Sequence, residues 1–160
     1  MAENFTARPA LVADAAGISA LIHSLLHHRT PEPADPAPEP FMALFAPQAI
    51  EGYITAGNYN YLVALDQGQL VGVLGVRDNR HLVHLFVAEP YQRRGIARTL
   101  WYRAKSEALA AEAEVEISVR SSVYATAVYE RFGFAVCGPR VEDVGVTYVP
   151  MRQVIRRGDC

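Results

Sequence analysis

The feature that most constrains the fold is an apolar run that leads through a short turn into a helical pattern, at residues 81–100. The residues before Pro90 have the composition of a strand, and Gly95 stands just before the apolar spacing of a helix. The start of a helix leaves several backbone N–H groups without partners in the helix, and such groups bind anions. The pattern therefore predicts a strand, a glycine-containing turn and a helix N-terminus that holds a phosphate-bearing ligand.

Length and composition are those of one globular domain. The chain has 160 residues, of which 51% are hydrophobic and 20% charged, which argues against a disordered or fibrous protein. The formal net charge of -2 gives no general attraction to nucleic acid or to an anionic membrane. We expect a single domain over residues 1–160, with neither nucleic acid nor membrane as a partner.

The two cysteines, Cys137 and Cys160, show no metal-ligand spacing and are too few for a disulfide framework. Reduced thiols are the default interpretation and fit a cytoplasmic protein. The start of the chain lacks the pattern of a signal peptide, and no run approaches the length of a membrane span. We expect a cytoplasmic location and no bound metal.

The first part of the chain predicts a strand over residues 5–11 and a helix from Asp14, as N-cap, to about residue 28. Residues 30–40 hold five of the ten prolines, which predicts an extended, semi-rigid loop. Helical spacing returns over residues 41–55, where Pro47 is expected to break the helix into two pieces.

Two apolar runs, residues 61–65 and 70–77, flank a four-residue turn and predict a β-hairpin. The strand of the opening segment follows the hairpin. Beyond it we expect a helix over residues 96–111, a strand over 115–120 and a second helix over 123–132. Two final strands are expected over residues 134–137 and 144–151, followed by a short C-terminal tail from about residue 152. This order predicts an α/β domain with a mixed sheet, antiparallel at the hairpin and parallel where helices intervene.

The sequence of the turn around Gly95 matches neither the Walker P-loop nor the GxGxxG pattern, which argues against kinase and dehydrogenase functions. Instead, Gln92-x-x-Gly95-x-Ala97 after an apolar strand resembles the acetyl-CoA signature of the GNAT superfamily of N-acetyltransferases, (Gln/Arg)-x-x-Gly-x-(Gly/Ala). Residues 119–134 resemble a second motif of that family, a strand, loop and helix that ends in Tyr129-Glu130-x-x-Gly-Phe.

The resemblance covers nearly the whole chain and implies the GNAT fold, a central mixed, largely antiparallel β-sheet that is splayed in a V and flanked by helices. It also implies acetyl-CoA as cosubstrate. The cofactor-binding positions it implies are Leu85, Phe86, Val87, Gln92, Arg93, Arg94, Gly95, Ile96, Ala97, Arg98, Ser122 and Tyr129. Gly95 lets the backbone approach the pyrophosphate, whereas the three arginines either contact phosphate or are only solvated. Ser122 or Arg120 stands where the family often has asparagine.

Acetyl transfer to an amine needs a neutral nucleophile, a stabilised oxyanion and a proton for the departing thiolate. By resemblance Tyr129 is the acid, although its helical spacing also fits a core aromatic. The base is open between His81, His84 and a water chain. Alternation puts the two histidines on opposite faces of their strand unless a bulge intervenes. On the next strand, Glu116 and Ser118 share a face, and Ser118 is a poor base.

The resemblance implies an acetyl-CoA-dependent N-acetyltransferase, which we expect to act on a primary amine of a small molecule or peptide by direct transfer in a ternary complex. The alternative from another functional class is a catalytically weak module that binds acyl-CoA as a sensor or partner domain. The sequence leaves the acceptor open, and either a monomer or a homodimer is compatible with it.

Overall fold

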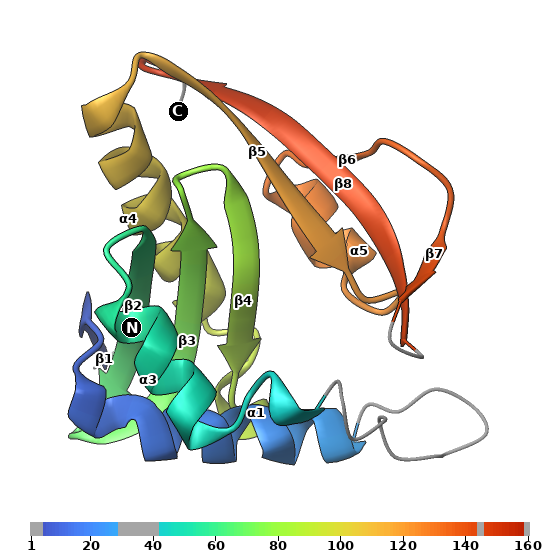
Figure 1. The fold of residues 1–160 in the computed structure, drawn as a ribbon. Helices are drawn as coiled ribbons and strands as arrows, with labels where there is room; N and C mark the ends of the chain where they lie inside the picture. Colours follow the sequence, from blue (N-terminus) through green and yellow to red (C-terminus); the bar gives the residue numbers. More distant parts are fainter. Residues whose placement is uncertain (1–4, 29–41, 144–145, 159–160) are drawn as a thin grey trace.

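A single sheet organises the molecule (Figure 1). The computed structural model describes residues 5–28, 42–143 and 146–158. The strands are β1 (Phe5–Pro9), β2 (Tyr59–Asp66), β3 (Gln69–Arg77), β4 (His81–Val87), β5 (Glu114–Ser121), β6 (Ala135–Val136), β7 (Val141–Asp143) and β8 (Val146–Arg156). The described α-helices are α1 (Ala15–His28), α3 (Pro47–Thr55), α4 (Ile96–Ala111) and α5 (Thr126–Arg131), and 3₁₀ turns span Val12–Asp14 and Glu89–Tyr91. The sheet order is β1-β2-β3-β4-β5-β8-β6, with β7 paired to β8.

Strands β4 and β5 run parallel and separate almost as soon as they meet. Only His81 with Ser118 and Leu82 with Val119 are paired between them, whereas the other described strand pairs are antiparallel. Helix α4 makes the crossover that a parallel pair requires. Beyond the two pairs the strands diverge, so the sheet opens into a V (Figure 1). The predicted mixed, largely antiparallel and splayed sheet is thus confirmed.

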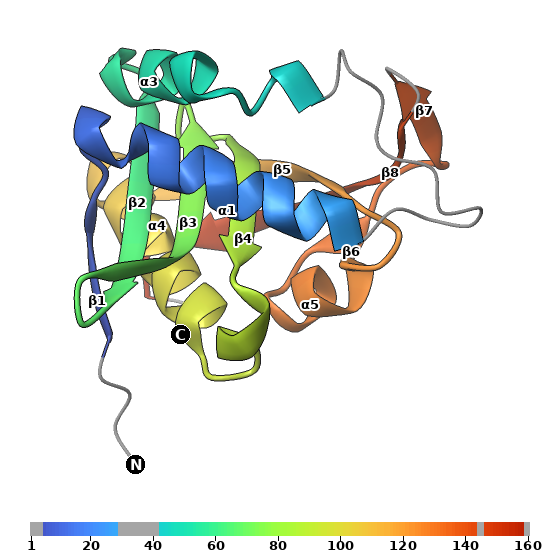
Figure 2. The same cartoon turned by 90° about the horizontal axis from the view of Figure 1, so that it is seen from below.

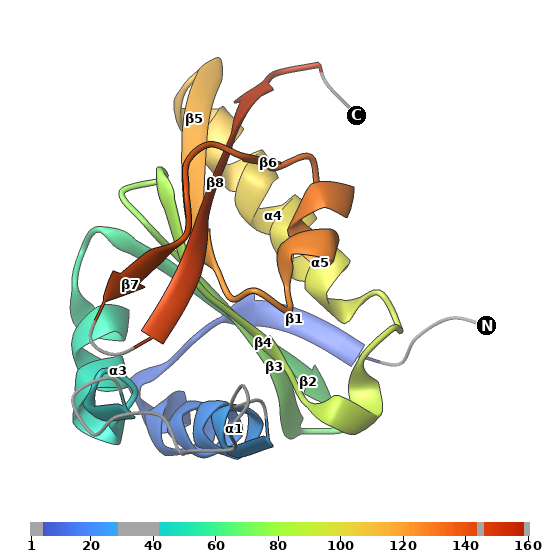
Figure 3. The same ribbon diagram turned by 90° about the vertical axis from the view of Figure 1, so that its right-hand side faces the viewer.

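Helices cover both faces of the sheet (Figure 3). On one face α4 buries Leu100 and Trp101 completely against β2, β3 and the β5 side of the V. On the other face α1 crosses β2, β3 and β4 (Figure 2) and packs with α3, burying Ile18, Ile22 and Ile50. The apolar side chains of α1 therefore face the sheet.

The hairpin and the long helix follow the sequence pattern closely. Gln67 and Gly68 form the two-residue turn between β2 and β3, both with positive φ (52° and 84°), as a tight hairpin turn requires. Helix α4 spans the predicted residues. Pro47 occupies the first turn of α3, where its missing N–H costs no helical hydrogen bond.

Several predicted boundaries are wrong. Asp14 does not cap α1, because it ends the preceding 3₁₀ turn and its carboxylate accepts hydrogen bonds from the N–H of Leu11 (2.7 Å) and from the guanidinium of Arg8 on β1 (2.8 Å). Helix α5 is shorter than residues 123–132, since the Ala125 N–H closes a turn on the carbonyl of Ser122. Strand β8 continues to Arg156, so residues 152–156 lie in the sheet and not in a tail, and β7 was not predicted. The proline-rich loop at residues 30–40 lies outside the described residues.

Candidate active site

The separation of β4 from β5 leaves backbone groups of β4 without a strand partner. The Ala88 N–H donates to the carbonyl of Val71 on β3 (2.8 Å). Along a strand, the N–H and C=O groups of successive residues point to opposite edges in turn. The N–H and C=O groups of Leu85 and Val87 therefore point away from β3, into the opening of the V. The Gln92 side-chain amide donates to this exposed Val87 carbonyl (2.9 Å), which ties the following turn to the end of β4.

The turn after β4 delivers the N-terminus of α4 with free backbone donors. Gly95 is the N-cap residue, with φ 83° and no side-chain cap, and the first helical bond runs from the Thr99 N–H to its carbonyl (3.0 Å). The N–H groups of Ile96, Ala97 and Arg98 therefore lack acceptors within the helix. The Ile96 side chain is buried in the core, so only its backbone faces outward.

Three arginines surround this helix start. Arg93, Arg94 and Arg98 are exposed, and Arg93 has a positive φ of 66°. The Arg94 guanidinium lies 5.2 Å from the centre of the Tyr91 ring, and Arg98 lies 5.0 Å from that of Tyr102. Stacking on tyrosine holds two cations beside the free N–H groups, an arrangement suited to a phosphate-bearing ligand.

Tyr129 lies on α5, on the α4 side of the sheet, and is 8% exposed. Its ring packs at right angles to Phe132 and Phe134, which is the core role that its spacing also allowed. Burial raises the pKa of its hydroxyl, so the group is protonated at neutral pH. Within the described residues this hydroxyl has no hydrogen-bonding partner. The Tyr129 hydroxyl is also not fully enclosed by protein. Among the described residues, the one side-chain nitrogen or oxygen that is both fully enclosed and unpartnered is Trp101 Nε1.

The two histidines lie on the same face of β4, contrary to simple alternation. Gly75 pairs with His84 and Val76 with Leu82, so β4 carries one extra residue, Val83, as a bulge. His84 packs among the aromatic rings on the α1 and α3 side. Because Leu82 is in the core on the α4 side, the neighbouring His81 also points to the α1 and α3 side.

His81 is exposed at the point where β4 and β5 meet. Its Nδ1 lies 2.5 Å from the hydroxyl oxygen of Ser118 on β5. Its pKa is lowered, first by partial burial and then by nearby guanidinium groups. These groups belong to Arg77, Arg120 and Arg80, and the carboxylate of Asp78 opposes them. His81 is therefore neutral at pH 7, the form that a base requires.

His84 is buried, with 8% of its surface exposed, and lies among the rings of Phe45, Tyr53, Tyr61 and Phe86. Burial lowers its pKa to about 4. Its Nδ1 is hydrogen-bonded to the Tyr61 hydroxyl at 2.7 Å, a contact that the sequence did not indicate.

The remaining predicted residues contribute in different ways. The backbone of Phe86 pairs with Val73 of β3, and its side chain packs on the α1 and α3 side against Phe45. Only its neighbours Leu85 and Val87 therefore present backbone to the opening. Ser122 is exposed just after β5, and its carbonyl accepts the Ala125 N–H. Glu116 is held by Arg152 at 3.3 Å and is therefore occupied as an ion-pair partner.

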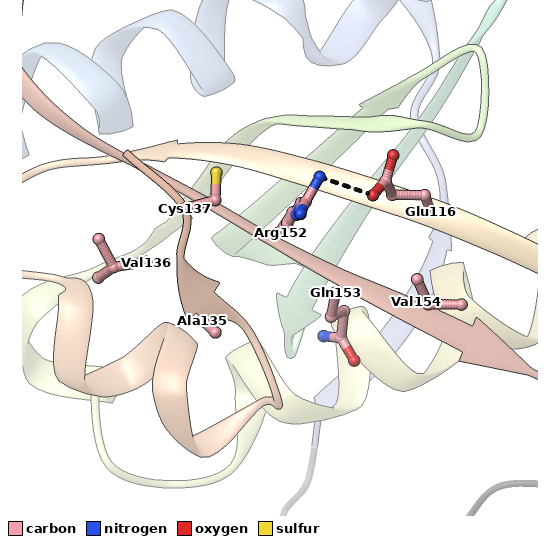
Figure 4. A pocket seen from close by; sticks show the side chains of 7 residues that line it. All are labelled: Glu116, Ala135, Val136, Cys137, Arg152, Gln153 and Val154. Carbon is pink, nitrogen blue, oxygen red and sulfur yellow. Dashed lines mark ion pairs between the residues drawn. The ribbon is translucent and has the colours of Figure 1, made fainter. Parts of the chain in front are cut away.

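A separate pocket of about 340 Å³ lies against strands β5, β6 and β8 (Figure 4). Its lining includes Glu116, Arg152 and the exposed Cys137, and none of the predicted catalytic or cofactor-binding residues. In the described parts of the chain we find no cluster of three or more potential metal ligands. No helix in those parts is long and apolar enough to span a membrane.

The model of the acetyltransferase (GNAT) domain family matches residues 27–155, which is most of the chain. The chain belongs to the GNAT acetyltransferase family. Solved structures of similar fold agree with this GNAT assignment. A GCN5-related N-acetyltransferase from Rhodopseudomonas palustris has a TM-score of 0.80 at 22% identity, covering 97% of this chain and 98% of that one.

The names of two further similar structures mention a ligand or a substrate. The PaiA N-acetyltransferase from Thermoplasma acidophilum, in complex with coenzyme A, has a TM-score of 0.71 at 15% identity over 96% of this chain and 99% of that one. The spermidine N-acetyltransferase SpeG from Vibrio cholerae has a TM-score of 0.63 at 21% identity and covers 94% of both chains. No curated protein sequence matches the chain significantly.

Proposed function

We propose that this GNAT domain transfers an acetyl group from acetyl-CoA to a primary amine by direct transfer in a ternary complex. The observation that carries the proposal is the unpartnered backbone edge of β4 at Leu85 and Val87, directly followed by the free N–H groups at the start of α4. An extended ligand arm extends a sheet along such an edge, and a pyrophosphate binds such a helix start.

The cofactor fits this path in two parts. The pantetheine arm would bind along Leu85 and Val87, and the pyrophosphate would bind the backbone between Arg93 and Arg98. Arg94 and Arg98, already held over tyrosine rings, supply positive charge beside the pyrophosphate. The coenzyme A complex of the structurally similar PaiA protein supports a coenzyme A ligand for this fold.

The reaction then needs one acid and one base. The neutral amine attacks the acetyl carbonyl carbon, the carbonyl oxygen becomes negatively charged, and backbone N–H groups near Val87 stabilise it. When the carbon–sulfur bond breaks, the Tyr129 hydroxyl gives its proton to the thiolate. The amine loses a proton to a histidine, His81 or His84, or to a water chain. Tyr129 suits its part because its hydroxyl is protonated, unpartnered in the described residues and not enclosed.

An acceptor with an amine is supported by the name of the similar SpeG structure, a spermidine N-acetyltransferase. Direct transfer is supported by the position of Cys137, which is exposed on the β6 arm and lines a pocket that shares no residue with the proposed site.

Isothermal titration with acetyl-CoA tests the cofactor part of the proposal. We expect saturable binding with one site per chain, weakened by added salt because the phosphates meet arginines. Desulfo-CoA, which retains the pyrophosphate, is expected to compete. If the chain binds neither compound at millimolar concentration, the proposed function is wrong.

A further inference from the structure

Tyr61, Gly75 and His84 form a row across three neighbouring strands. Tyr61 on β2 pairs with Gly75 on β3, and Gly75 pairs with His84 on β4. The Tyr61 ring lies over Gly75, because a Cβ added there would come within 2.8 Å of the ring. The absence of a side chain at Gly75 therefore lets the tyrosine reach across β3, and its hydroxyl meets His84 Nδ1 at 2.7 Å.

The direction of the Tyr61–His84 hydrogen bond follows from which group carries a proton to donate. Burial raises the pKa of the Tyr61 hydroxyl, so it keeps its proton, and in the described residues His84 Nδ1 is its one acceptor. A neutral imidazole carries a proton on one nitrogen only. If Nδ1 accepts the tyrosine proton, the N–H group of His84 is at Nε2.

The other ring nitrogen, Nε2, is left for a ligand. It makes no hydrogen bond within the described part of the chain, although His84 is more than nine-tenths buried. Nε2 is also not fully enclosed by the protein. His84 directly precedes Leu85, whose backbone faces the opening of the V.

We propose that Tyr61 is a positioning residue that holds His84 in the Nε2–H tautomer, so that His84 donates a hydrogen bond to an oxygen of the reacting groups and is not the general base. This inference rests on the proposed function for the identity of those groups. It leaves His81 or a water chain to accept the proton of the amine. The titratable groups that face His84 are Tyr61 and Tyr53, and no charged side chain contributes to its pKa.

Nitrogen-15 NMR of the histidine-labelled protein tests the tautomer without any substrate. We expect the two-bond proton–nitrogen pattern of His84 to show a protonated Nε2 and an unprotonated Nδ1 across the neutral pH range. Tyr61→Phe keeps the ring over Gly75 but removes the donor, and should convert this pattern to a mixture of tautomers. Tyr53→Phe is the matched control, because the Tyr53 hydroxyl donates to the Leu44 carbonyl and not to His84.

Kinetics then separate positioning from base catalysis. Tyr61→Phe should lower kcat roughly tenfold, the usual order for one lost hydrogen bond, with the acetyl-CoA KM and the acidic limb of the pH profile unchanged. A protonated Nδ1 in the wild-type protein, or an acidic limb that shifts in Tyr61→Phe, would overturn the inference. Failure of the chain to bind acetyl-CoA would overturn the proposed function while leaving the NMR result to decide the tautomer.

Discussion

At the scale of single residues, the proposed mechanism assigns the general acid to the hydroxyl of Tyr129. Tyr129→Phe keeps the ring packing with Phe132 and Phe134 but removes the proposed proton donor for the thiolate. We expect kcat to fall by about 100-fold or more, the usual contribution of general acid catalysis, with the Kd of acetyl-CoA nearly unchanged. Tyr124→Phe, at an exposed tyrosine before the same helix, is the control and should keep full activity. Wild-type turnover in Tyr129→Phe would remove Tyr129 from the mechanism.

Gly95 is the second residue that tests the proposed function, because it lies at the proposed cofactor site. A Cβ there meets no protein atom within 4 Å, so Gly95→Ala adds only backbone strain at φ 83° and a methyl group on the ligand side. We expect acetyl-CoA to bind about tenfold more weakly by calorimetry, since the methyl group hinders close approach of the pyrophosphate. Gly158→Ala has a comparable φ of 91° and equally open surroundings at the C-terminal end of β8. An equal loss of affinity in both variants would contradict the site.

His84 makes a prediction about stability that does not depend on function. Its pKa falls from 6.5 to about 4 on burial. Between these values the unfolded chain binds a proton that the folded chain does not, so the free energy of unfolding decreases as the pH falls. The change amounts to about 3 kcal/mol from pH 6.5 to pH 4 and is absent at higher pH. Urea denaturation over this range should show it in the wild type and not in His84→Gln; equal pH dependence would show that His84 is not buried as described.

Single residues also mark the limit of what the sequence predicts. The position of Gly95 is predictable because a glycine between an apolar strand and a helical pattern is typical of a turn in which the backbone approaches an anion. The Tyr61–His84 contact is not predictable, because the hairpin turn implies a register that pairs Tyr61 with Leu74. A bulge between Ala64 and Leu65 shifts the register by one residue and brings Tyr61 opposite Gly75. The bulge at Val83 likewise turns His81 to the face of His84.

At the scale of elements, the free edge of β4 is the feature that amide exchange can test. The N–H groups of Leu85 and Val87 point into the V, whereas that of Ala88 is bonded to Val71. We expect the amides of Leu85 and Val87 to exchange quickly in the free protein and to become protected when acetyl-CoA is added. The amide of Ala88 should be protected in both states. NMR-detected hydrogen exchange measures this directly. Slow exchange at Leu85 and Val87 without ligand would mean that the edge is already paired.

Elements are predictable where their pattern is local. Helix α4 has a complete apolar face and β2–β3 a tight glycine turn, and the sequence predicts both with nearly correct bounds. The extent of β8 depends on pairing with β5 along its whole length, up to Arg156 with Glu114. Strand β7 is formed only by pairing with β8. Such long-range pairing has no counterpart in the local spacing of residues.

At the scale of the whole molecule, the start of α4 and the Tyr129 helix lie on one side of the sheet, and the two histidines point to the other. Strands β4 and β5 diverge between them. The V itself is predicted by the family resemblance alone, since neither composition nor periodicity predicts that two paired strands separate. We propose that acetyl-CoA and the amine approach from these two sides and meet in the opening between the strands.

The most direct test of the proposed activity is release of coenzyme A from acetyl-CoA by the purified chain, measured across a panel of amines, amino acids, polyamines and peptides, with mass spectrometry of the products. We predict that at least one primary amine gives coenzyme A and its N-acetylated product in equal amounts, with no acetylated protein intermediate. Saturable binding of acetyl-CoA without turnover on any member of the panel would contradict this activity and favour a domain that only senses acyl-CoA.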